Sequence, residues 1–289
     1  MTRFVLGSLF LNCQDQIYSE EYSDFIGNRS LIESKYALDC KQPLGAMFAS
    51  LYLKLSDGYE DGTVYGYYNI PKLFGLQDTG SMESSGILQV RENPDLKLDG
   101  SGVLIGFVDT GIDYAGSIFL KQDGTTRVTA IWDQTIPAGS PIRLPAQPEL
   151  PETPENITRT PEGFLYGSEF THEQLNAAVK MADAYEGISS RDENGHGTFL
   201  ASIAAGNELP DGSFTGAAPK ADIAMVKLKP AKNRLRAYYQ IKEDAVAYQE
   251  NDIMAGVLYL VSLAKKRQQP LVICLGLGTN AGSHRGGLP

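Results

Sequence analysis

The sequence predicts an α/β fold in which a parallel sheet is flanked by helices, and three observations lead to it. Residues 103–108 form an almost unbroken apolar run, which is typical of a strand covered on both faces of a parallel sheet. Residues 222–227 and 271–275 have the same apolar character. Between these two runs, five apolar residues recur at helical spacing: Ile253, Val257, Leu260, Val261 and Ala264. Strand, helix and strand in this order predict a right-handed parallel crossover.

The ends of that helix can also be predicted. Asn251 or Asp252 is expected to cap its start, because short polar side chains accept hydrogen bonds from the first backbone N–H groups. Gln268-Gln-Pro270 is expected to end it, because proline cannot continue a helix.

Composition excludes several classes of protein. The chain has 289 residues, of which 42% are hydrophobic and 21% charged, so it can bury a sizeable core. A formal net charge of -10 and the lack of a basic stripe exclude nucleic acid as the expected partner. No apolar run is long enough to span a bilayer. Cys13, Cys40 and Cys274 are an odd number without metal spacing, so we expect neither a disulfide scaffold nor a metal or other cofactor. Cys274 is expected to be a small buried side chain.

Asp109 ends the first apolar run, directly before Thr110-Gly111. Ligands of open α/β sheets bind at the carboxyl ends of parallel strands, so this carboxylate is a candidate functional group. The alternative is an aspartate that only stabilises the turn by bonding its own backbone.

His196 lies between Gly195 and Gly197, whose missing Cβ atoms allow backbone or a substrate to come close. A helix rich in small residues follows and is expected to end at Gly206. The positive end of that helix favours a neutral imidazole, as a general base requires. The alternative is a histidine that fills the helix end for packing.

The order Asp109-Thr-Gly and His196-Gly-Thr resembles the aspartate and histidine motifs of the subtilases, the subtilisin-like serine peptidases. Four further stretches resemble the clostridial branch related to the Csp germination proteases: Ile70-Pro-Lys-Leu-Phe-Gly-Leu76, Thr125-Thr-Arg-Val-Thr-Ala-Ile-Trp-Asp-Gln134, Tyr166-Gly-Ser-Glu-Phe-Thr171 and Leu275-Gly-Leu-Gly-Thr-Asn280. The resemblance therefore covers most of the chain from about Ile70 onward.

This resemblance implies a serine-type endopeptidase with catalytic Asp109 and His196, acting on a peptide or protein substrate. His196 would take the proton of a serine, and Asp109 would hold the far nitrogen of the ring. The family's serine stands in a Gly-Thr-Ser context, which this sequence lacks, and its oxyanion-hole asparagine is expected beyond Pro289. None of four serines has a matching context: Ser117, Ser202, Ser262 and Ser283. This chain alone is therefore expected to be inactive, and the alternatives are a pseudoprotease used as a regulatory or binding module, or an inactive fragment.

Gly276, Leu277 and Gly278 follow the last apolar run and match the edge on which subtilases bind substrate. Backbone pairing of an extended peptide along such an edge depends little on sequence. Gly276 stands where relatives often carry serine. Without the resemblance, these residues would be interpreted as a loop that ends a strand.

Three zones divide the chain. Residues 1–68 take the place of a propeptide, expected to pack on the catalytic domain, although a permanent N-terminal subdomain is the open alternative. Residues 69–98 are a connecting arm with a short helical candidate at 83–88. Residues 99–289 are the N-terminal part of a subtilase catalytic domain, with a Pro-rich insertion at about 135–165 that is expected to be exposed. The apolar residues 4–11 lack a cleavage site, so the cytoplasm is favoured over export, and the sequon at Asn156 is interpreted as coincidence.

Overall fold

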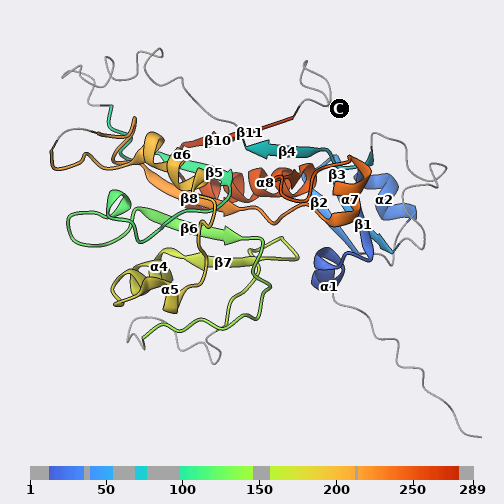
Figure 1. Ribbon diagram of the computed structural model, residues 1–289, viewed down its shortest axis with the longest axis horizontal. Helices are drawn as coiled ribbons and strands as arrows, with labels where there is room; N and C mark the ends of the chain where they lie inside the picture. Colours follow the sequence, from blue (N-terminus) through green and yellow to red (C-terminus); the bar gives the residue numbers. More distant parts are fainter. Residues whose placement is uncertain are drawn as a thin grey trace, which may run out of the picture.

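The computed structural model describes residues 13–35, 40–54, 69–76, 98–145, 157–211 and 214–279. A five-stranded sheet forms its centre, in the order β10-β5-β8-β6-β7 (Figure 1). Its strands are β5 (Leu104–Asp109), β6 (Val128–Asp133), β7 (Ser168–Thr171), β8 (Asp222–Lys227) and β10 (Leu271–Cys274). All neighbouring strands run parallel except β7, which is antiparallel to β6. The predicted parallel sheet is confirmed, with β7 as its one antiparallel strand among the described residues.

Alternate side chains of β5 contribute to two separate apolar clusters, one on each face of the sheet. Leu104 and Val108 pack in the cluster that contains α8 (Glu250–Arg267). Ile105 and Phe107 pack in the other, with residues of α4 (His172–Val179), α5 (Ala184–Gly187) and α6 (His196–Ala205). Every residue of β5 is buried. The apolar run at 103–108 is therefore explained by coverage on both faces.

Among the described strands, β10 lies at the edge of the sheet, although its apolar sequence is typical of a strand buried on both faces. In β10, Val272 is 56% exposed, and the other three residues are only partly buried. The expectation of a buried strand at 271–275 was therefore wrong in this respect. Its half-buried Cys274 is a free cysteine.

The start of α8 also differs from the expectation. The helix begins at Glu250, its cap position is Gln249, and no side chain caps it. Asn251 and Asp252 lie inside the first turn, both buried. They bind groups from distant segments instead of the helix N-terminus, which local sequence could not reveal. The helix ends where expected, at Arg267, and Gln268 takes the left-handed conformation with φ 54°.

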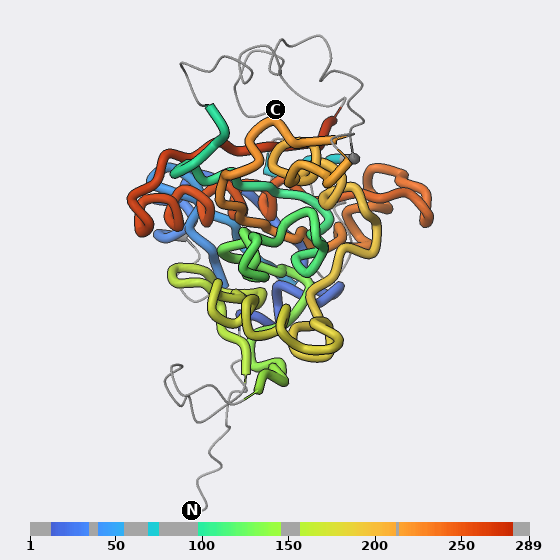
Figure 2. Tube along the Cα trace, turned by 90° about the vertical axis from the view of Figure 1, so that its left-hand side faces the viewer, coloured from blue at the N-terminus to red at the C-terminus, as the bar shows by residue number. Residues whose placement is uncertain are grey.

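The N-terminal residues form a small unit of their own beside the sheet (Figures 1 and 2). Its elements are α1 (Cys13–Tyr18), β1 (Tyr22–Asn28), α2 (Arg29–Lys35), β2 (Cys40–Leu44) and β3 (Phe48–Lys54). The three strands are antiparallel, in the order β1-β3-β2. A disulfide bond joins Cys13 to Cys40, so the expectation that the cysteines build no disulfide was wrong. The two cysteines are 27 positions apart in sequence, and only the packing of α1 on the small sheet brings them together.

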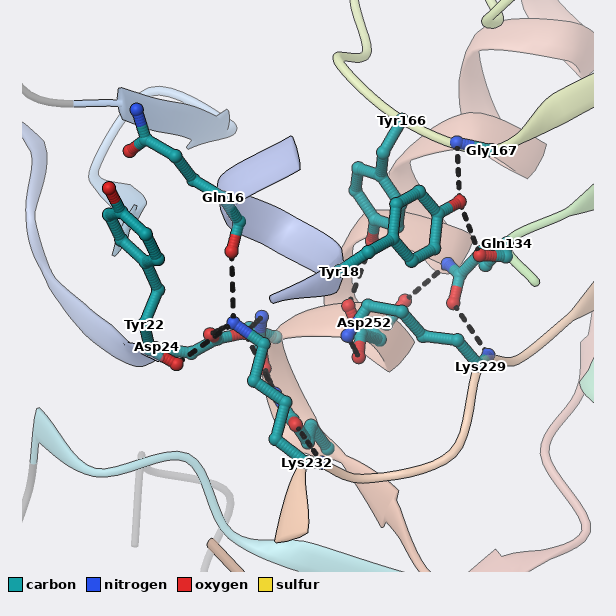
Figure 3. Close-up of polar contacts among 12 residues, drawn as sticks. Gln16, Tyr18, Tyr22, Asp24, Gln134, Tyr166, Gly167, Lys229, Lys232 and Asp252 are labelled. Carbon is teal, nitrogen blue, oxygen red and sulfur yellow. Dashed lines mark hydrogen bonds and ion pairs between the residues drawn. The ribbon is translucent and has the colours of Figure 1, made fainter. Parts of the chain in front are cut away.

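A buried group of polar side chains, which we call the polar junction, joins this unit to the α/β layer (Figure 3). The Lys232 ammonium pairs with the Asp24 carboxylate, and Lys229 Nζ lies 2.7 Å from Asp252 Oδ2. Tyr18 donates its hydroxyl hydrogen to the carbonyl oxygen of Gln134 at 2.6 Å. In the structure, the N-terminal segment thus packs on the remainder of the chain.

The Pro-rich insertion is less exposed than expected. Its described parts, 135–145 and 157–165, contain no helix or regular strand, only isolated bridges. Ile142, Thr158 and Phe164 are nevertheless buried. Ile142 and Phe164 each pack in one of the two apolar clusters, and Thr158 Oγ1 accepts the hydroxyl hydrogen of Ser168 in β7. Residues 146–156 lie outside the described residues, as do the expected features at 4–11 and 83–88. In the described part of the chain, no helix is both long and apolar enough to cross a membrane.

Candidate active site

Asp109 is the last residue of β5, and its carboxylate is almost fully buried. Its Oδ1 lies 2.8 Å from Nδ1 of His196 and accepts the backbone N–H of Thr110 at 2.8 Å. Its Oδ2 is buried and has no hydrogen-bond partner among the described residues. Burial raises the pKa of Asp109 above its ordinary value, and the contact with His196 opposes that rise. The strand therefore delivers a shielded carboxylate to the imidazole, as expected at the end of a parallel strand.

His196 is the first residue of α6, so its ring stands at a helix N-terminus. Its side chain is 14% exposed, compared with 1% for the Asp109 side chain. Gly195 before it has φ 88°, a left-handed conformation that side chains disfavour. With Nδ1 donating to Asp109, Nε2 of a neutral ring is the nitrogen that can accept a proton. The geometry suits a general base that is oriented by Asp109 and mostly shielded from solvent.

Gly197 explains how the two segments come so close. A Cβ atom at this position would lie 2.2 Å from the carbonyl oxygen of Gly111 and 3.2 Å from Cβ of Asp109. Because the first of these is a backbone atom, it could not move aside without shifting the loop. Glycine at 197 therefore lets α6 contact the loop after β5, which is the close approach expected for a glycine beside the histidine.

Asp192 is a site residue that the sequence did not single out. Its Oδ1 accepts hydrogen bonds from Thr110 Oγ1 and Gly195 N, and its Oδ2 accepts from the backbone N–H and the hydroxyl of Thr198. Burial raises its pKa, but the hydrogen bonds from Thr198 and Thr110 outweigh that effect, so the net pKa is lowered. An Asp three residues before Gly195 is a recognisable turn signal that could have identified it.

Gly276 lies directly next to the Asp109–His196 pair. A Cβ atom there would be 2.2 Å from Leu200 Cδ1, 3.1 Å from His196 Cε1 and 3.3 Å from Asp109 Oδ2. The two following residues form the short strand β11 (Leu277–Gly278). Of the three residues expected to bind substrate, Gly276 therefore borders the pair, and Leu277 and Gly278 continue from it into β11.

The edge formed by β11 is already paired with another part of the chain. β4 (Leu73–Leu76) runs antiparallel to β11, with Leu277 opposite Leu76 and Gly278 opposite Gly75. On its other side, β4 runs antiparallel to β9 (Tyr248–Gln249), so it is the middle strand in the order β11-β4-β9. The segment expected to be a connecting arm thus contributes a strand beside the candidate site.

A cavity of about 710 Å³ is lined in part by neighbours in sequence of the Asp109–His196 pair. Thr110 and Asn194 line it next to the Asp109–His196 pair, and Val246 and Tyr248 line it on the side of β9. Lys227 lies in its wall, where its ammonium binds the Arg191 carbonyl and Glu193 Oε2. The segment that carries α7 (Asn233–Tyr238) also contributes to the wall, so the cavity depends on the long connection between β8 and β9.

The serines that were weighed as nucleophiles in the sequence have structural positions or lie outside the described residues. Ser202 donates its hydroxyl to the carbonyl oxygen of Thr198 within α6 at 2.8 Å, which fits the expected packing role. Ser117 lies in the short 3-10 helix η2 (Ser117–Phe119), and Ser262 is exposed on α8. Ser283 lies outside the described residues.

Comparisons with known proteins identify the family of this chain. The model of the subtilase family of peptidases matches residues 100–288, which is more than half of the chain. The chain belongs to the subtilase family.

Individual relatives are more distant. Two subtilisin-like proteases of Arabidopsis thaliana are similar: SBT3.8 is 30% identical over 144 residues, 44% of this chain and 16% of that protein, and SBT3.5 is 28% identical over 168 residues, 55% of this chain and 19% of that protein. The structure of the Clostridium perfringens CspB protease matches with a TM-score of 0.50 and 30% identity, covering 69% of this chain and 34% of that one. The chain thus spans less than a fifth of these two curated relatives and about a third of the solved structure.

Proposed function

We propose that this chain supplies the acid–base half of a serine-endopeptidase site. The observation that carries the proposal is the distance of 2.8 Å between His196 Nδ1 and Asp109 Oδ1 in a shielded site at the end of a parallel strand. His196 takes the hydroxyl proton of a serine at Nε2 as that serine attacks a peptide carbonyl. It then gives the proton to the leaving amine, while Asp109 stabilises the transient imidazolium.

The nucleophile in this proposal is a serine that the 289 residues do not contain in the family's Gly-Thr-Ser context. Without it, no acyl-enzyme can form, and the printed chain does not cleave peptides by itself. The catalytic residues assigned to it are therefore Asp109 and His196 only.

The substrate is a peptide or protein that binds in extended form along Gly276, Leu277 and Gly278. β4 supports this assignment because it already pairs with β11 in the way that an extended peptide would. In this interpretation, residues 1–68 are a propeptide-like unit, residues 69–98 are the arm that places β4 in the binding edge, and residues 99–289 belong to the catalytic domain.

A second candidate function rests on the same observations. A subtilase module without its serine, whose binding edge is paired with its own β4, could act as a regulatory or binding protein. The buried Asp109–His196 pair favours the peptidase, because a binding module has no need for an oriented imidazole.

Labelling with a fluorophosphonate probe separates the two assignments. The printed chain is expected to remain unlabelled, and labelling would contradict the missing nucleophile. In a longer protein that includes a Gly-Thr-Ser segment, we expect labelling and peptide hydrolysis.

In that longer protein, the His196→Ala variant should lower the turnover of peptide hydrolysis by roughly three orders of magnitude or more. His172→Ala is the matched control, since the His172 ring hydrogen-bonds the Thr126 carbonyl before β6 and, among the described residues, no group of the site. Equal loss in both variants would contradict the assignment of His196.

A further inference from the structure

We propose that Asp192 is a positioning residue, which fixes the separation of Asp109 and His196 by holding the loop after β5 against the N-terminus of α6. None of the hydrogen bonds of Asp192 within the described part of the chain goes to either of these two side chains. Its carboxylate instead binds the residue after Asp109 and the residue two positions after His196, at Thr110 Oγ1 (2.7 Å) and Thr198 Oγ1 (2.6 Å). This proposal rests on the proposed function of the Asp109–His196 pair.

Each of the two hydroxyls links one segment to the other. Thr110 Oγ1 donates to Asp192 and accepts the backbone N–H of Gly197 at 2.9 Å. Thr198 Oγ1 also donates to Asp192 and accepts the backbone N–H of Asp113 at 3.0 Å. The loop after β5 therefore binds α6 through Thr110, and α6 binds the loop through Thr198. A hydroxyl has one hydrogen to donate, so the acceptor at Asp192 fixes the direction of both links.

The same carboxylate also completes the turn that carries His196. Gly195 N donates to Oδ1 at 2.9 Å, Asn194 N donates at 3.3 Å, and Thr198 N donates to Oδ2 at 2.8 Å. These are backbone donors at a helix N-terminus, where a negative charge is stabilising. Asp192 is thus the common acceptor for the turn, the helix and the loop, and charge-assisted hydrogen bonds of this kind are among the stronger ones in proteins.

Asp192→Asn is the direct test, because it keeps the shape but replaces one acceptor oxygen by a donor. The readout is the proton on His196 Nδ1 in the chain of 289 residues. NMR detects it as a resonance downfield of the amide protons, and its loss in His196→Ala assigns it. We expect wild type to show this resonance and Asp192→Asn to lose it. Asp99→Asn is the matched control: Asp99 binds Ser101 N and Lys220 but contacts neither segment of the site. It should retain the resonance.

A second pair of variants keeps the charge of Asp192 and covers the case in which Asp192→Asn does not fold. Thr198→Val removes the hydroxyl link and should lose the resonance, whereas Thr198→Ser keeps the hydroxyl and should restore it. A purely stabilising role would lower the free energy of unfolding and leave the resonance in place. That result in Asp192→Asn or in Thr198→Val would overturn the proposal. A wild-type protein without the resonance would overturn the proposed function as well, so the two failures can be told apart.

Discussion

At the scale of single residues, the site depends on contacts that leave little room for other side chains. Gly197 is fixed by the backbone of Gly111, and Gly276 is fixed by the ends of Leu200 and His196. The first neighbour is rigid and the second is flexible, so position 197 tolerates substitution less well than position 276. Gly197 thus sets how closely α6 approaches the end of β5.

The lowered pKa of Asp192 predicts an acid-dependent stability difference between wild type and Asp192→Asn. The folded state holds this carboxyl ionised to lower pH than the unfolded state, whose value is about 3.8. Its contribution is therefore fully present above that pH and is lost as the pH falls through the lowered folded pKa. Urea unfolding at neutral pH and at about pH 3 should show a difference that shrinks in acid. A difference independent of pH would contradict the assignment.

At the scale of elements, the sequence predicted the strands that are covered on both faces. β5 and β8 fall on the expected residues, because their apolar runs report burial directly. The end of α8 was predictable from Pro270, but its start was not. Asn251 and Asp252 have the right chemistry for a cap and are used in the polar junction instead. β10 has the apolar composition of a central strand and lies at the edge, which composition cannot distinguish.

The polar junction should be the most sensitive contact between the N-terminal unit and the sheet. Asp24→Ala would leave the Lys232 ammonium buried without its carboxylate, which costs roughly 3–5 kcal/mol of the free energy of unfolding. Urea denaturation measures this loss. Glu21→Ala is the matched control in the same unit, because its pair with Lys54 is exposed and should matter little.

The double variant Asp24→Ala with Lys232→Met extends this test. Removing both charges takes away the unpaired ammonium, so part of the lost stability should return. A double variant whose loss of stability equals the sum of the two single losses would show that the pair itself contributes little to the junction.

At the scale of the whole molecule, the disulfide between Cys13 and Cys40 closes a loop across the N-terminal unit. The two residues are 27 positions apart, and a loop of that size stabilises a fold by roughly 3–4 kcal/mol in the chain-entropy model. Cys13→Ser with Cys40→Ser should lower the urea midpoint accordingly. Cys274→Ser, which removes the free thiol, should leave the urea midpoint unchanged. Equal midpoints for all three proteins would show that the bond does not form in solution.

Contacts between distant segments mark the limit of prediction from sequence. Asp109 and His196 could be paired in advance, because each stands at a recognisable element end and the resemblance gives their order. Asp24 with Lys232, Cys13 with Cys40 and β4 with β11 could not, because nothing local links residues so far apart in the chain. The carboxylate of Asp192 lies between these cases: its turn is visible in the sequence, but its reach to Thr110 is not.

The position of β4 between β9 and β11 has a consequence for any peptide added from outside. β4, which pairs with β11, belongs to the same chain. Its local concentration is therefore set by the segments that connect it and not by the bulk protein concentration. For short tethers this effective concentration is on the order of millimolar. Dilution does not separate β4 from β11. A free peptide of ordinary affinity therefore has to compete with an intramolecular strand for pairing with β11.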